Sequence, residues 1–174
     1  MGGYVALRAV KRNPERIVGL ILADTRSEGD PNPGKIGRAT SIKKIKAGGL
    51  SEFCEGFLKS CFAPESFQKI PDRIEKIRHT ILGNPPLGIC GTLMALAGRT
   101  DTTGSLGSIQ VPTLILVGEK DAITPREFSQ KMKAGIPGSE LVLIPQAGHL
   151  SNVENPETFN QSLNQFMSHF SATV

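Results

Sequence analysis

The sequence of 174 residues predicts an α/β fold in which three parallel strands are joined by crossover helices and one helical segment is inserted between two strands. Two observations support this prediction. Residues 17–23, 112–117 and 141–144 are short apolar runs with the length and composition of strands buried on both faces. Helical patterns lie between the second and third runs and after the third, and this alternation is typical of a parallel sheet.

The first residues predict a helix followed by a strand. Small and branched apolar side chains recur at helical spacing over residues 5–10, and Pro14 ends this helix at Asn13. The apolar run IVGLILA then occupies residues 17–23 and ends at Asp24.

Residues 25–108 predict a helical insertion, because a turn cluster at residues 30–34 is followed by helical patterns and by no convincing strand. Three apolar faces recur at helical spacing: Leu50, Phe53, Cys54, Phe57, Leu58 and Cys61; Ile70, Ile74, Ile77 and Ile81; and Ile89, Leu93, Leu96 and Ala97. We therefore expect residues 1–24 and 109–174 to form one α/β core, with residues 25–108 inserted into it as a helical lid.

Two helices are predicted after the second and third strands. The segment Thr124-Pro125-Arg126-Glu127 has the pattern of a capping box, and Gly135 suits a left-handed helix end. Asn155-Pro156 opens the last helix, whose apolar stripe contains Phe159, Leu163, Phe166 and Phe170.

Composition excludes several classes of protein. A hydrophobic content of 39% and a net charge of +4 are typical of a globular chain. No apolar run approaches the ~20 residues that span a bilayer, so we expect a cytoplasmic protein without a membrane partner. The three cysteines, Cys54, Cys61 and Cys90, fit no metal spacing and are expected to be reduced and buried. We expect no metal and no cofactor.

A basic stretch is the only feature that points toward nucleic acid. Lys35, Arg38, Lys43, Lys44 and Lys46 lie close together in the sequence. They lack interleaved aromatic residues and any known nucleic-acid motif, so a solvated helix surface is the favoured interpretation and no nucleic-acid partner is expected.

Two residues at strand ends could carry chemistry. Asp121 follows the second strand in VGEKD, and His149 follows the third in QAGH. Because the carboxyl ends of parallel strands meet at one edge of a sheet, we expect the two side chains to lie close together. A carboxylate beside an imidazole is the orienting half of a nucleophilic triad. Asp24, which also follows a buried strand, is the alternative acid; its other interpretation is a cap at the strand end.

The segments LILVGEKDAITP and LVLIPQAGHLSNVENPETFNQSLNQFM resemble the acid and histidine segments of the α/β-hydrolase superfamily. The nearest group contains lid-bearing esterases and 3-oxoadipate enol-lactonases. MGGYVALRAVKRNPERIVGLILADT resembles the segment directly after the nucleophile in that family, where the elbow commonly reads G-x-S-M-G-G. The resemblance implies the C-terminal part of an α/β-hydrolase fold, beginning just after the nucleophilic serine.

The resemblance also implies roles for single residues. Asp121 matches the triad acid and His149 the catalytic base. Met1 matches the residue after the nucleophile, whose backbone N–H is half of the oxyanion hole, and Gly2 matches the last glycine of the elbow, where little room is left for a side chain. The serine would stand one position before Met1 and has no counterpart in this chain, so we expect the isolated chain to be inactive toward an ester or lactone substrate.

Two further expectations concern the function and the partners of the chain. The alternative function is a non-catalytic remnant of the fold that acts as a binding or interaction protein. The strand over residues 17–23 is expected to be a sheet edge with unpaired backbone groups. The chain would then associate through it, either as a homodimer or with a complementing N-terminal segment.

Overall fold

A three-stranded parallel sheet lies at the centre of the computed structural model, which describes residues 1–171. The strands run in the order β1 (Leu20–Ala23), β2 (Thr113–Gly118) and β3 (Glu140–Ile144). Leu20 pairs with Thr113 and Leu114 pairs with Glu140. The predicted α/β fold with three parallel strands is confirmed, although β1 begins at Leu20 rather than at residue 17.

Helices connect and cover these strands. The α-helices are α1 (Gly2–Arg12), α2 (Asn32–Lys46), α3 (Leu50–Cys61), α4 (Ser66–Lys69), α5 (Pro71–Gly83), α6 (Pro86–Ala97), α7 (Arg126–Gly135), α8 (Ser151–Glu154) and α9 (Pro156–Ser171). Two short 3₁₀ helices, η1 (Pro14–Arg16) and η2 (Thr103–Ser108), precede β1 and β2.

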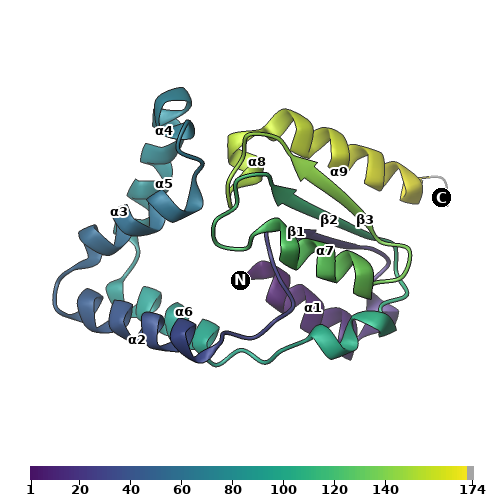
Figure 1. Cartoon of the computed structure of the whole chain (residues 1–174), viewed down its shortest axis with the longest axis horizontal. Coiled ribbons are helices and arrows are strands. Elements are labelled where there is room, and N and C mark those ends of the chain that lie inside the picture. The colour runs from purple at the N-terminus through teal and green to yellow at the C-terminus, as the bar shows by residue number, and fades with distance from the viewer. Residues whose placement is uncertain (172–174) are drawn as a thin grey trace.

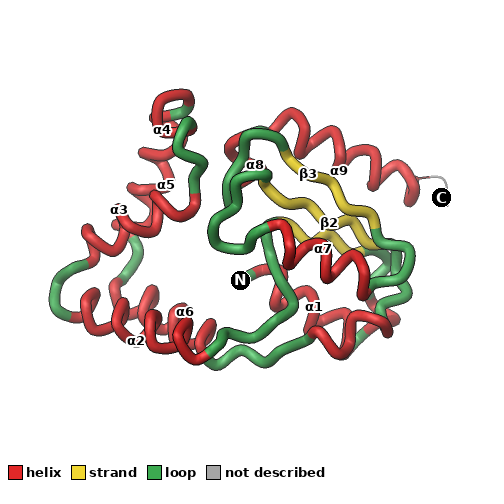
Figure 2. The backbone as a smooth tube through the Cα atoms, in the orientation of Figure 1, coloured by secondary structure: helices red, strands yellow, loops and turns green. Residues whose placement is uncertain are grey.

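The sheet is the middle layer of three, with α1 and α7 on one face and α9 on the other (Figures 1 and 2). Alternate strand residues divide between the two faces, as the two-residue period of a strand requires. Leu22 and Ile115 pack with Met132 of α7 on the first face. Leu116 packs with Phe166 of α9 on the second. This two-sided burial is why the strands are continuous apolar runs in the sequence.

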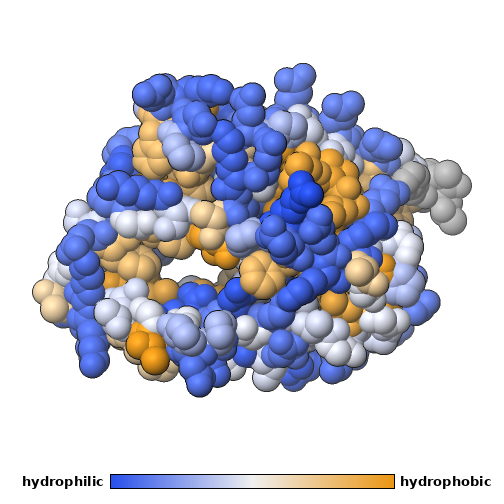
Figure 3. Space-filling view, viewed as in Figure 1, coloured by the Kyte–Doolittle hydropathy of each residue, from blue (hydrophilic) through white to orange (hydrophobic). Residues whose placement is uncertain are grey.

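Helices α2–α6 stand beside the sheet and have apolar clusters of their own (Figure 1). One cluster, around Leu58 and Ile74, joins α3 to α5, and the other, around Ile45 and Leu93, joins α2 to α6. In the space-filling view an opening remains between this helical insertion and the core (Figure 3). The insertion contacts the core where the chain enters and leaves it and again around residues 61–66, and it stands away from the core between these contacts (Figure 3).

A cluster of charged side chains lies where the chain leaves the core for α2. The buried carboxylate of Asp30 forms ion pairs with Arg26 at 2.6 Å, with Arg99 at 2.8 Å and with Arg38. Burial alone would raise the pKa of Asp30, but the hydrogen bond from Arg38 and the charges of Arg38 and Arg99 outweigh it and lower the pKa. The carboxylate stays ionised and ties the start of the insertion to its return segment.

Two local expectations were wrong. Thr124 caps no helix; α7 begins at Arg126, and the Thr124 hydroxyl bonds to Asp121 instead. The left-handed glycine after α7 is Gly138 rather than Gly135, which is the last residue of the helix. At the end of the insertion, Leu106 of η2 packs in the core cluster.

The cysteines and the helix lengths can be compared with what the sequence predicted. Cys54, Cys61 and Cys90 are free and buried, as predicted. Among the described residues no single helix is long and apolar enough to cross a membrane; α5 and α6 reach that length and composition only together, with a bend of 97° between them.

Candidate active site

Asp121 lies just beyond the carboxyl end of β2, with its side chain fully buried. Oδ1 accepts the backbone N–H groups of Ile123 at 2.8 Å and Thr124 at 2.9 Å. Oδ2 accepts the Thr124 hydroxyl at 2.7 Å and His149 Nδ1–H at 2.9 Å. The carboxylate is thus held from four directions and presents one oxygen to the imidazole.

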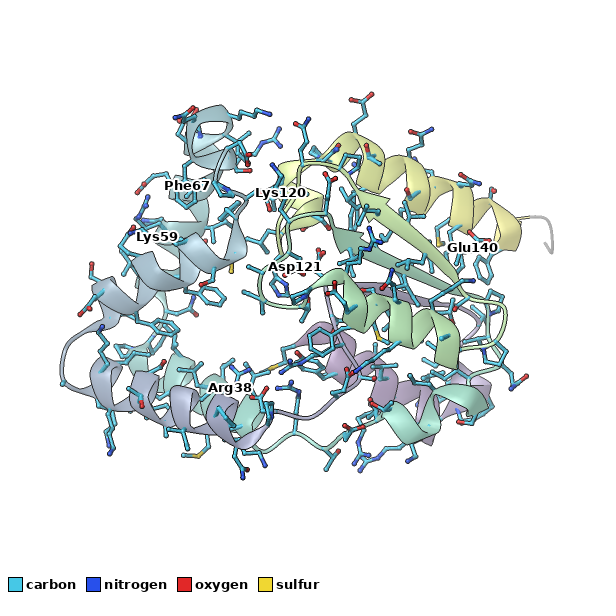
Figure 4. The ribbon with its side chains drawn as sticks, in the orientation of Figure 1. Arg38, Lys59, Phe67, Lys120, Asp121 and Glu140 are labelled. Carbon is cyan, nitrogen blue, oxygen red and sulfur yellow. The ribbon has the colours of Figure 1, made fainter. Side chains whose placement is uncertain are left out.

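His149 lies in the loop of residues 145–150, which joins β3 to α8. Its backbone N–H donates to the carbonyl of Cys61 at 2.7 Å, and its side chain is 22% exposed. With the Nδ1 proton directed at Asp121, Nε2 of the neutral ring is free to accept a proton. The sequence expectation that strand ends bring Asp121 and His149 together matches this geometry. Figure 4 shows Asp121 at the sheet end that faces the insertion, with Glu140 at the opposite end of β3.

The surroundings of Asp121 favour its charged form. Burial alone would raise the pKa, but the hydrogen bond and charge of His149, together with the hydrogen bonds of Thr124, lower it below the ordinary value. A carboxylate that stays ionised is suited to hold one tautomer of the imidazole and to stabilise the imidazolium.

Two glycines allow the acid and histidine loops to pack closely. A Cβ atom on Gly118 would lie closer than 3.0 Å to the carbonyl oxygens of Ala147 and Gly148. A Cβ on Gly148 would lie 2.6 Å from the carbonyl oxygen of Cys61 and 2.9 Å from the nitrogen of Ala63. Lys120 N–H also donates to the carbonyl of Ala147 at 2.8 Å. The end of β2, the histidine loop and the insertion therefore meet backbone to backbone.

Asp24 holds the strand ends together and does not bond to His149. Its Oδ1 accepts Gly118 N–H at 2.8 Å, and its Oδ2 accepts the Ser151 hydroxyl at 2.5 Å and Ser151 N–H at 3.2 Å. Its φ of 45° lies in the left-handed region, which aspartate tolerates better than most residues. Of the two acids considered from the sequence, Asp121 is the one that bonds to the imidazole, and Asp24 caps the ends of β1 and β2.

Replacing Asp24 with asparagine is expected to change how stability depends on pH. Burial raises the pKa of Asp24 from 3.8 to about 6, so the folded state holds this proton more tightly than the unfolded state does. The unfolding free energy of the wild type should therefore fall as the pH rises from 4 to 6, by up to ~3 kcal/mol from this group. Asp24→Asn should lack this fall. Urea unfolding at pH 4, 5, 6 and 7 measures it, and a pH-independent difference between the two proteins would contradict it.

A pocket of about 410 Å³ brings His149 together with the start of α1. Its lining includes Met1, Gly2, Asp24 and His149. A Cβ on Gly2 would meet no atom of the described structure within 4 Å, whereas a Cβ on Gly3 would collide with Thr25. No cluster of three or more His, Cys, Asp or Glu side chains suited to a metal occurs in the part of the chain that the structure describes.

The family model described as serine aminopeptidase, S33 (Hydrolase_4) matches residues 1–156. The chain belongs to this α/β-hydrolase family. The resemblance predicted from the sequence is confirmed.

The chain is also similar to individual curated proteins. It is 28% identical to 3-oxoadipate enol-lactonase 2 of Acinetobacter baylyi over 98% of this chain and 62% of that protein. It is 29% identical to the pimeloyl-[acyl-carrier protein] methyl ester esterase of Neisseria meningitidis over 91% of this chain and 63% of that protein. The chain therefore spans somewhat less than two thirds of these relatives.

The chain is also similar to solved structures of esterases and lactonases. A thermophilic esterase from Thermogutta terrifontis matches with a TM-score of 0.91 and 36% identity, over 97% of this chain and 62% of the esterase chain. The enol-lactonase from Burkholderia xenovorans matches with a TM-score of 0.88 at 21% identity, over 97% and 63% of the two chains, which shows the shared fold. The relatives are hydrolases of the esterase and lactonase kind.

Sequence reasoning missed two residues that shape the site. Thr124 bonds to both members of the acid-histidine pair, but its position before Pro125 is typical of a helix cap. Glu154, five residues after His149, bonds to the histidine loop through Gly148. Thr124 is three residues from Asp121 and Glu154 is six from Gly148, but their other partners, His149 and Ala63, are 25 and 91 residues away and leave no local signal.

Proposed function

We propose that this chain is part of a serine hydrolase that cleaves small esters or lactones through a Ser-His-Asp triad. The observation that carries the proposal is the 2.9 Å hydrogen bond from His149 Nδ1 to the buried carboxylate of Asp121, at the carboxyl ends of adjacent parallel strands. His149 is the general base and then the general acid, and Asp121 orients it. Family membership supports the same chemistry.

The reaction would be acyl transfer in two halves. The serine Oγ attacks the substrate carbonyl carbon while His149 Nε2 takes the hydroxyl proton, and the backbone N–H of Met1 donates to the oxyanion. His149 then gives its proton to the departing alkoxide, and an acyl-serine remains. Water, deprotonated by His149, attacks this ester and releases the acid, which restores serine. In a lactone the alkoxide and the acid stay in one product molecule.

We propose that the serine stands immediately before Met1 in the complete protein. Met1 and His149 line one pocket, so a serine at that position would adjoin the imidazole. The match to 62% of the Acinetobacter lactonase supports a longer parent protein. The 174-residue chain by itself would then lack turnover, because its nucleophile is absent.

The names of two relatives support the proposed substrate class. A relative named enol-lactonase and another named methyl ester esterase both act on carbon–oxygen acyl bonds. We propose that the helical insertion over residues 25–108 is a lid over this site, since it borders the opening beside Asp121 (Figures 3 and 4). The lid would set which esters or lactones enter.

We also propose that β1 accepts a further strand from a segment preceding Met1 in the complete protein. Among the described residues β1 is bonded only to β2, and the neighbouring Val18 is 77% exposed. Unpaired strand edges favour association. Light scattering after size exclusion should find the 174-residue chain dimeric or aggregated. The extended protein, which adds the segment encoded upstream of Met1, should be a monomer. A monodisperse monomer of the 174-residue chain would contradict this.

The experiment for the function begins with the nucleotides upstream of the Met1 codon. An open frame encoding G-x-S before Met1 is the expected result. The extended protein should then hydrolyse p-nitrophenyl esters and react with a fluorophosphonate at that serine. An in-frame stop directly before Met1 would refute the triad and favour the alternative of a non-catalytic binding protein.

A further inference from the structure

The histidine loop is hydrogen bonded to one segment of the helical insertion. His149 N–H donates to the carbonyl of Cys61, the last residue of α3, at 2.7 Å. The Gly148 position has no room for a Cβ beside the same carbonyl. The backbone that carries the candidate base is therefore in direct contact with residues 61–66, which we call the docking segment.

Glu154 connects the two sides of this contact. Its Oε1 accepts Gly148 N–H from the histidine loop at 2.7 Å. Its Oε2 accepts Ala63 N–H at 2.8 Å and the Ser66 hydroxyl at 2.6 Å, both from the docking segment. One carboxylate thus uses one oxygen for each side and bonds the residue next to His149 to the insertion.

Further polar and apolar contacts surround the bonds of Glu154 between the histidine loop and the docking segment. Lys120 pairs with Glu65 at 2.7 Å, and Lys69 donates to the side chain of Gln146 at 2.9 Å. Apolar side chains from both sides form one cluster, in which Leu150 and Val153 of the core pack with residues of α3–α5. Figure 4 places Lys120 of the core opposite Phe67 of the insertion.

We infer that Glu154 is a positioning residue for His149, and that through it the hydrogen bond from His149 to Asp121 depends on the docking segment. The inference rests on the proposed function for its catalytic meaning. Glu154 touches no reacting atom in the mechanism; it acts by fixing the loop whose backbone sets the direction of the imidazole.

Glutamine at position 154 breaks this arrangement by a simple mismatch. Three donors, two N–H groups and one hydroxyl, converge on two carboxylate oxygens. A carboxamide has one acceptor oxygen and one donor nitrogen, so an N–H group would face another donor on one side of the joint. The volume is unchanged, and only the bonding differs.

Proton NMR tests the inference without turnover; the sample is the extended protein, or the 174-residue chain itself where light scattering finds it monodisperse. Glu154→Gln is expected to broaden or remove the downfield Nδ1–H resonance of His149 and to speed exchange of the His149 amide by tenfold or more. Ser66→Ala, which removes one donor from the docking segment alone, should speed that exchange by a smaller factor. Glu157→Gln, at an exposed glutamate in the first turn of α9, is the matched control and should change neither.

The outcomes separate this inference from the proposed function. A His149 Nδ1–H resonance and amide protection equal to the wild type in both Glu154→Gln and Ser66→Ala would overturn it. If Glu154→Gln fails to fold, Ser66→Ala still decides, because it keeps the carboxylate and its bond to Gly148. An extended protein that hydrolyses no ester would refute the function while leaving the coupling between Glu154 and His149 intact.

Discussion

Replacing His149 with alanine in the extended protein should lower kcat by roughly 10⁴-fold or more, because serine then has no base to take its proton. Asp121→Asn should cost roughly 10³- to 10⁴-fold, since the imidazole loses the carboxylate that selects its tautomer. The measurement is steady-state hydrolysis of p-nitrophenyl esters with each variant.

A second histidine provides the control for this prediction. His79 is exposed on α5. His79→Ala should leave kcat and KM unchanged. A His149→Ala variant that retains wild-type kcat would refute the triad assignment, and equal losses in His149→Ala and His79→Ala would indicate damage to the fold rather than to the site.

Replacing Gly118 with alanine should destabilise the fold by about 3 kcal/mol or more, because the new methyl group meets fixed backbone. Its nearest neighbours would be the carbonyl oxygens of Ala147 and Gly148, and no flexible side chain can move aside. The histidine loop must shift to admit it, so the bond from His149 to Asp121 should also be lost. Urea unfolding measures the stability, and the Nδ1–H resonance of His149 measures the bond.

Gly91 is the matched control for this substitution. It lies in α6, and a Cβ there would meet nothing within 4 Å. Gly91→Ala should raise stability by about 0.5–1 kcal/mol, as alanine does in helix interiors. A Gly118→Ala protein as stable as the wild type would show that the two loops are less tightly packed than the structure describes.

The acid-histidine pair shows which features of the site could be predicted from the sequence. Asp121 and His149 each follow an apolar run, and parallel strands place their carboxyl ends at one edge; the sequence therefore predicted their proximity. The role of Thr124 was predicted wrongly, since a threonine before proline has the local signature of a cap. Its hydroxyl instead bonds to Asp121, because the buried carboxylate needs donors where the loop turns.

In the helical insertion, one helix could not be predicted from the sequence pattern. Apolar stripes predicted α3, α5 and α6, but α2 has no comparable stripe and was not predicted. Its helix is held by packing against α6 and by the ion pair of Arg38 with Asp30. Asp30 lies only eight residues before Arg38, but α6 follows α2 with three further helices and their turns in between.

The α/β fold with three parallel strands could be predicted from the sequence alone, and the same patterns predicted the helical insertion and the acid-histidine pair. Each of these follows from local periodicity or from residues at strand ends. The three-dimensional contacts were needed to show that Asp24 caps strands, that Gly118 and Gly148 lie in close backbone contacts, and that Glu154 joins the histidine loop to the insertion. These features arise where segments far apart in the chain meet, and hydrogen-bond partners at such junctions have no local pattern to reveal them.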